Sequence, residues 1–113
     1  MTKPSTLKID DVEYVRADSI KPLGNTNGTP FVVGQAYLIR TVTMCLTGRV
    51  IGVVGQFLII SEAAWIADTG RFNECLSKGT ASEVEPANGN VFVGLGGIID
   101  VYEWPHSLLR VVK

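Results

Sequence analysis

The sequence predicts an all-β domain, a five-stranded open barrel with one short helix between its third and fourth strands and a β-hairpin arm at the N-terminus. Runs of β-branched and aromatic residues recur along the chain and are separated by glycine-containing turns, which is typical of antiparallel β-structure. The 113 residues suffice for one hydrophobic core. Because 46% of the residues are hydrophobic and only 19% are charged, some apolar surface is expected to face another subunit.

Residues 1–30 are predicted to form the hairpin arm and a linker, and residues 31–113 the barrel. Two β-prone runs, residues 7–9 and 12–15, flank the turn-forming pair Asp10-Asp11, a pattern that favours a hairpin. Residues 22–30 are rich in glycine and asparagine, which tolerate turn conformations, so this segment is interpreted as the linker.

Three strands are predicted to follow as an antiparallel meander, over residues 35–43, 49–54 and 57–61. The pairs Thr47-Gly48 and Gly55-Gln56 are predicted to form the turns between them. In the second and third strands the apolar residues do not alternate cleanly with polar ones. This pattern predicts that both faces of these strands are covered.

A short helix is predicted over residues 71–76. Asp68 or Thr69 is expected to cap its N-terminus, and Gly79 is expected to end it. Its apolar face consists of Phe72, Cys75 and Leu76. Trp65 and Ile66, just before the helix, are expected to anchor it to the barrel.

The last two strands are predicted over residues 90–94 and 98–104. Asn88-Gly89 is a strong turn signal before the fourth strand. The run Leu95-Gly96-Gly97 is predicted to make a tight connection to the fifth strand. Pro105 is predicted to end the fifth strand.

Composition excludes several classes of function. Cys45 and Cys75 are thirty positions apart, no Cys-x-x-Cys occurs, and His106 is the single histidine, so no metal site and no cofactor are expected. The beginning of the chain lacks the apolar core of a signal peptide, and the longest apolar run, residues 50–60, is far below the roughly 20 residues that span a bilayer. These features predict a reduced cytoplasmic protein that does not enter a membrane.

Three motifs that could indicate an active site are better explained by structural roles. Asp68-Thr69-Gly70 matches the catalytic triplet of aspartic proteases, but helix signals follow at once, so a helix cap is the better interpretation. The glycines of residues 94–97 lead into a strand and not into the helix N-terminus that a phosphate loop requires. His106 has no nucleophile in a motif context and is interpreted as a surface residue, so no enzyme is expected.

Two runs resemble the motifs of the Sm family of small SH3-type barrels. Residues 48–60 are similar to the first Sm motif, and within them residues 56–60 are similar to the bacterial Hfq branch. Residues 91–101 are similar to the second Sm motif. Residues 39–43, 47–49 and 65–72 resemble a group of small phage and prophage proteins. The Sm resemblance covers residues 34–104, with residues 62–89 as a long insertion. It implies an Sm-like fold, a homo-oligomeric ring of about five to seven subunits, and RNA as a partner in a bacterial cytoplasm.

The RNA-binding loops of that family are only partly matched. The family reads uridine-rich RNA with an Asp and an Asn in its first loop and an Arg-Gly pair in its second. Here the first loop is residues 54–57 and the second is residues 95–97, and neither contains those residues. The remaining candidates for contacts with RNA or single-stranded nucleic acid are Gln56 and Phe57 for bases, Arg40 and Arg49 for backbone charge, and Gly96 and Gly97 for close approach.

The ring is expected to form through the fourth and fifth strands, because an open barrel leaves unpaired backbone groups there. The predicted subunit interface consists of Val91, Phe92, Val93, Ile98, Ile99 and Val101. The formal net charge is −1, whereas a nucleic-acid binder usually has an excess of basic residues. Arg40 and Arg49 repeated around a ring would nevertheless form a positive band.

Two alternatives keep the ring but change what it binds. In the first, a nucleotide-like ligand or a protein partner binds between subunits, with Trp65 and the inserted helix lining the pocket. In the second, the ring is a structural component of phage assembly. Trp65 and Trp104 could each stack on a base, but both are interpreted first as hydrophobic anchors.

Overall fold

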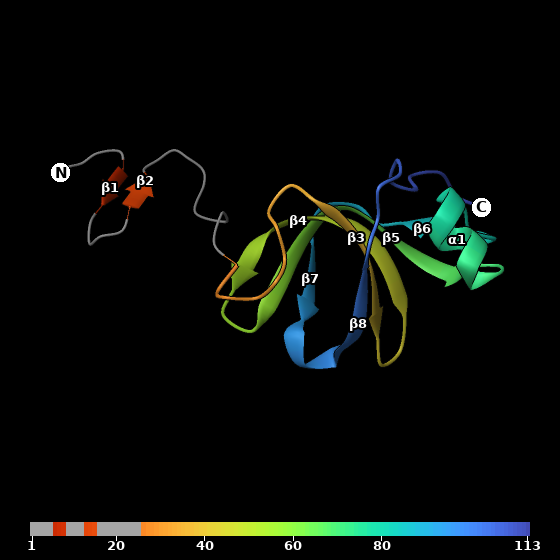
Figure 1. Cartoon of the computed structure of the whole chain (residues 1–113), viewed down its shortest axis with the longest axis horizontal. Helices are drawn as coiled ribbons and strands as arrows, with labels where there is room; N and C mark the ends of the chain where they lie inside the picture. Colours follow the sequence, from red (N-terminus) through yellow and green to blue (C-terminus); the bar gives the residue numbers. More distant parts are fainter. Residues whose placement is uncertain (1–5, 9–12, 16–25) are drawn as a thin grey trace.

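The structure, a computed structural model, describes residues 6–8, 13–15 and 26–113. Its elements are β1 (Thr6–Lys8), β2 (Glu13–Val15), β3 (Ala36–Thr41), β4 (Cys45–Val54), β5 (Phe57–Asp68), α1 (Phe72–Lys78), β6 (Glu83–Pro86), β7 (Val91–Gly94), the short 3₁₀ turn η2 (Leu95–Gly97) and β8 (Ile98–Glu103) (Figure 1). Over these ranges the protein consists mainly of β-strands with one short helix, which confirms the all-β prediction.

The two N-terminal strands pair antiparallel with each other, with Leu7 opposite Tyr14. They form a two-stranded sheet of their own. The predicted turn residues Asp10 and Asp11, and much of the predicted linker, lie outside the described residues.

The other strands form one open antiparallel sheet in the order β6-β5-β4-β3-β8. The twelve-residue strand β5 has two partners on one side, because residues 57–60 pair with β7 and residues 64–68 pair with β6. β7 and β8 therefore lie at opposite ends of the sheet, and each pairs with a single described strand.

The sheet is strongly curved (Figure 1), and its concave side holds the main core. Strands β3, β4, β5 and β7 contribute its buried side chains. They are Tyr37, Ile39, Leu46, Val50, Val53, Leu58, Ile60, Ala63 and Val93. Phe31 packs edge-on against Tyr37 at 5.3 Å between ring centroids, so the segment before β3 closes one side of this core.

Gly48 explains why the predicted turn at Thr47-Gly48 is wrong. Both residues lie inside β4, and the turn is formed by residues 42–44, where Thr41 Oγ1 accepts a hydrogen bond from the Met44 amide at 3.1 Å. A Cβ on Gly48 would be 2.7 Å from Ile60 Cδ1 across the curved sheet. The glycine therefore permits close approach of two strands instead of a reversal of the chain.

The inserted segment is more regular than the sequence predicted. β5 continues to Asp68 and β6 adds a sixth strand, so much of the predicted insertion of residues 62–89 is part of the sheet. Glu62 has a positive φ of 52°, and the register between β4 and β5 shifts across it, between the pairs Thr47–Ala64 and Arg49–Ser61. This bulge redirects β5 from its pairing with β7 to its pairing with β6.

Helix α1 begins one residue later than predicted, and its predicted cap is wrong. Arg71 is the N-cap and makes no side-chain capping bond, whereas Asp68 ends β5 and its Oδ1 accepts a hydrogen bond from the Gly70 amide at 2.8 Å. The predicted stop is confirmed, because Gly79 ends the helix in the left-handed conformation.

The apolar face of α1 packs on the convex side of the sheet. Cys75 is buried with Ala36, Leu38 and Trp104, and Phe72 and Leu76 pack against this cluster. Trp104 is thus a hydrophobic anchor, as predicted. Trp65 is not, because 45% of its surface is exposed.

The C-terminal segment covers the remaining convex face of β5 and β6. Leu109 packs against both convex clusters, and Lys113 and Val84 exchange two backbone hydrogen bonds at 3.0 and 3.1 Å. The guanidinium of Arg110 donates to the carbonyls of Ala63 and Ala87, so it fastens this segment to β5 and to the loop after β6.

Candidate nucleic-acid interface

The two loops expected to contact nucleic acid lie side by side. The Leu95 amide donates a hydrogen bond to the Gln56 carbonyl at 2.8 Å, and Phe57 is directly opposite Gly94 in the β5–β7 ladder. Gln56 and Gly96 are exposed, and half of the surface of Phe57 is exposed. The strand pairing thus brings a carboxamide, an aromatic ring and a glycine together at one edge of the sheet.

The glycines of η2 leave this edge open to close approach. A Cβ built on Gly96 or Gly97 would meet no atom within 4 Å. The Gly97 carbonyl also accepts a hydrogen bond from the Val42 amide at 3.0 Å, which ties η2 to the β3–β4 turn. The backbone of η2 is thus held in place, and its two glycines present no side chain to a ligand.

Arg40 is not available as a free positive charge. Its Nε and Nη2 donate to the two carboxylate oxygens of Asp100, its cross-strand neighbour, at 2.7 and 2.6 Å, and its guanidinium lies 5.8 Å from the ring centroid of Phe72. These hydrogen bonds raise the pKa of the guanidinium and hold the pKa of the Asp100 carboxyl below its ordinary value.

Arg49 is also paired. Its Nε donates to Glu62 at 3.2 Å, and its Nη1 donates to the Gly34 carbonyl at 2.9 Å. Because Arg40 is opposite Cys45, the two arginines are separated by four positions of β4, about 13 Å of strand. In a single subunit a carboxylate therefore balances each arginine, and the positive band of a ring stays a prediction.

The residues predicted for the subunit interface divide into two groups. Val93 is buried, and Val91, Ile98 and Val101 pack against the main core, so these four stabilise the chain's own fold. Phe92 and Ile99 remain exposed over 66% and 62% of their surfaces. Ile99 is the bulged residue of β8, because Arg40 and Thr41 pair with Asp100 and Ile98 on either side of it.

An exposed apolar surface connects the candidate site to the edge strand β7. Val54 and Phe57 are opposite each other in the β4–β5 ladder, and Phe92 is two positions from Gly94, the β7 partner of Phe57. All three side chains are at least half exposed. Val54 was missed by the sequence analysis, because a valine in a β-prone run gives no signal of which face it occupies.

The other polar candidates have structural roles. One ring nitrogen of His106 is 2.7 Å from the Leu76 carbonyl, and the ring packs edge-on against Trp104, so His106 fixes the end of α1 and is not a simple surface residue. Burial raises the pKa of the Cys45 thiol to about 11 and also raises the pKa of the Cys75 thiol. Within residues 26–113, no group of three His, Cys, Asp or Glu residues could hold a metal ion.

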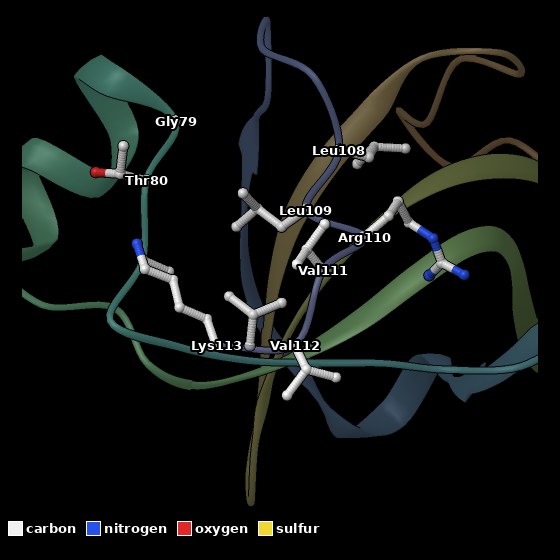
Figure 2. Close-up of a pocket in the computed structure, with 10 residues that line it drawn as sticks. Gly79, Thr80, Leu108, Leu109, Arg110, Val111, Val112 and Lys113 are labelled. Carbon is white, nitrogen blue, oxygen red and sulfur yellow. The ribbon is translucent and has the colours of Figure 1, made fainter.

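A pocket of about 250 Å³ lies between the α1–β6 loop and the C-terminal segment (Figure 2). Its walls are mostly apolar and include Leu108, Leu109 and Val84, and Thr80 and Lys113 lie at its edge. The pocket is remote in sequence from Gln56 and Phe57 and shares none of the predicted site residues.

No helix in the described ranges is long and apolar enough to cross a membrane. Comparison with family models, with curated proteins and with solved structures finds no match to this chain.

Proposed function

We propose that this chain is a non-catalytic, Sm-like subunit of a homo-oligomeric ring that binds RNA or another single-stranded nucleic acid. The observation that carries the ring is the position of β7 and β8 at opposite ends of one open sheet, where each is paired on one side only within the described part of the chain. Two different edges that pair between copies make a head-to-tail contact, and such a contact closes into a ring when the rotation between copies permits it.

Exposed apolar side chains mark both edges. Phe92 projects from β7 and Ile99 from β8, and each has more than half of its surface exposed. Strand edges that remain unpaired in solution are usually protected by charged residues or proline. Strand β7, with the sequence Val-Phe-Val-Gly, contains neither. A second copy of the chain supplies what these edges lack, namely backbone partners and an apolar cover.

A mixing experiment tests this arrangement. Phe92→Lys disables the β7 face and Ile99→Lys the β8 face, and each variant alone is expected to be monomeric by light scattering. Mixed together, the two variants retain one intact pair of faces, so they are expected to form a one-to-one dimer and nothing larger. Val111→Lys, which changes an apolar side chain exposed over 79% of its surface outside both edges, is the control and should keep the mass of the unmodified protein. Monomeric unmodified protein at high concentration would exclude the ring.

Phe57 and Gln56 support nucleic acid as the ligand. An aromatic ring with half of its surface exposed can stack on a base, which contributes about 1–3 kcal/mol per base, and the adjacent carboxamide can bond base edges. Because Arg40 and Arg49 are paired with carboxylates, few phosphate contacts are available, and the dependence of affinity on salt is expected to be shallow.

The test is fluorescence anisotropy of a labelled oligouridylate, with the oligomeric mass measured in parallel. Phe57→Ala should weaken binding without changing the mass, whereas Val54→Ala, its exposed cross-strand neighbour, should change neither. A lower mass for Phe57→Ala would instead place Phe57 in the contact between copies. A ring that does not bind the oligonucleotide would leave the assembly proposal intact and would favour a small ligand or a protein partner.

A further inference from the structure

Trp65 is exposed on a part of the sheet that the proposed ring does not use. It lies on β5 opposite Leu46 of β4 and Glu85 of β6, and 45% of its surface is accessible. Met44, in the turn before β4, is also exposed. A tryptophan in the middle of a ladder buries its ring when the protein itself supplies a cover, so this exposure requires an explanation.

The charge beside Trp65 indicates what kind of group would cover it. Glu85, its direct cross-strand neighbour, is exposed, and no cation pairs with it in the described part of the chain. Farther along the same ladder Asp68 is opposite Glu83, a like-charge pair that is unfavourable unless a cation lies nearby. Lys113 does not fill this role, because its side chain extends towards Thr80 beside the pocket (Figure 2). These acids also disfavour a phosphate-bearing ligand at Trp65.

Elsewhere in the same protein, an arginine already lies between a carboxylate and an aromatic ring. At the opposite end of the sheet, Arg40 lies between the carboxylate of Asp100, at 2.6 and 2.7 Å, and the ring of Phe72, at 5.8 Å. Trp65 and Glu85 offer an aromatic ring and a carboxylate at paired positions of two strands, where Cβ atoms are about 5 Å apart. One guanidinium can therefore contact both side chains, stacking on the ring and bonding the carboxylate.

We propose that Trp65 and Glu85 form a docking site for an arginine side chain of a partner protein. Arginine is favoured over lysine because a planar guanidinium stacks on an indole and presents two parallel donors to a carboxylate. This inference does not depend on the ring or on RNA, since neither β7, β8, Gln56 nor Phe57 takes part in it.

The experiment measures the anisotropy of a labelled decaarginine peptide titrated with the full-length protein at low salt. Trp65→Ala and Glu85→Gln are each expected to weaken binding about five-fold, the size of one exposed cation–π contact or ion pair. The double variant should lose less than the product of the two effects, because both side chains contact the same guanidinium. Decalysine should bind more weakly than decaarginine.

Glu103→Gln is the matched control, because it removes one exposed carboxylate from the opposite end of the sheet. It is expected to bind the peptide as the unmodified protein does, and thermal melting should show that all the variants are folded. Equal weakening by Glu103→Gln and Glu85→Gln would reduce the binding to general electrostatics and overturn the proposal. A lower oligomeric mass for Trp65→Ala would also overturn the proposal, because it would assign Trp65 to a contact between copies. Loss of oligouridylate binding in Trp65→Ala would overturn it as well.

Discussion

Arg40 and Asp100 are directly opposite each other in β3 and β8, and two hydrogen bonds join the guanidinium to the carboxylate. The Tyr102 hydroxyl donates to the same carboxylate at 3.1 Å. This pair fastens the edge strand β8 to the sheet, and it balances the charge of an exposed arginine that was expected to contact phosphate. Arg40 therefore has a structural role in holding this edge.

The first prediction concerns acid stability. Hydrogen bonds from Arg40 hold the pKa of Asp100 below its ordinary value of 3.8, so the pair stabilises the fold above that pH, and the contribution is lost as the pH falls towards the depressed pKa. Urea unfolding of Asp100→Asn should give a lower midpoint than the unmodified protein near neutral pH and the same midpoint well below pH 3.8. In an Arg40→Gln background the same substitution should have little effect at either pH. A difference that persists at low pH would contradict the assignment to this carboxylate.

The second prediction concerns the contact between Gly79 and His106. Gly79 has a φ of 71°, and a Cβ on it would be 2.5 Å from the Cβ of His106. Gly79→Ala therefore combines backbone strain with a clash against a ring that also bonds Leu76, and it should lower the free energy of unfolding by about 2–3 kcal/mol.

Gly89→Ala is the control for that substitution. Its φ of 74° is nearly the same, but a Cβ there meets nothing within 4 Å. Gly89→Ala should lower the free energy of unfolding by about 1 kcal/mol, because it introduces backbone strain without a clash. Equal losses in the two variants by chemical denaturation would show that the His106 contact adds nothing.

Much of the local structure was predictable from the sequence, because it depends on neighbours in the chain. The β-branched runs located β3, β7 and β8 to within a few residues, and the spacing of Phe72, Cys75 and Leu76 identified the face that packs on the sheet. The left-handed stop at Gly79 was likewise a local signal.

What could not be predicted depends on pairing between distant segments. Arg40 and Asp100 are 60 positions apart, so nothing near Arg40 indicates that its charge is balanced. β6 consists of Glu83–Pro86, a composition poor in β-forming residues, and it is a strand because β5 offers it an edge. Gly48 shows the converse, since a glycine required for close packing against Ile60 gives the same local signal as a turn.

The third prediction concerns Thr47, whose side chain is fully buried and whose Oγ1 has no hydrogen-bond partner. It lies opposite Leu38 and Ala64, between the two clusters that Leu109 covers. An unsatisfied buried hydroxyl costs about 1–3 kcal/mol, and valine has nearly the same shape without it. Thr47→Val should therefore raise the free energy of unfolding by about 1 kcal/mol. Thr47→Ser keeps the hydroxyl and loses a methyl group, so it should lower stability by about 1 kcal/mol, and a loss in both variants would mean that the hydroxyl has a partner.

The last prediction concerns the reactivity of the two thiols, both of which are free. Burial raises the pKa of Cys45 to about 11, so at neutral pH almost none of it is the thiolate that attacks an alkylating reagent. Iodoacetamide labelling of the folded protein, followed by peptide mapping, should be slow at both cysteines near neutral pH. The rate at Cys45 should rise tenfold per pH unit up to about pH 11 while circular dichroism shows the fold intact. Cys75, which lies on α1 and is fully buried between this helix and the sheet, should remain the slower of the two throughout. Rapid labelling of Cys75 near neutral pH would mean that α1 lifts from the sheet on the timescale of the reaction, and that its packing against Leu38 and Trp104 is weaker than the buried contacts imply.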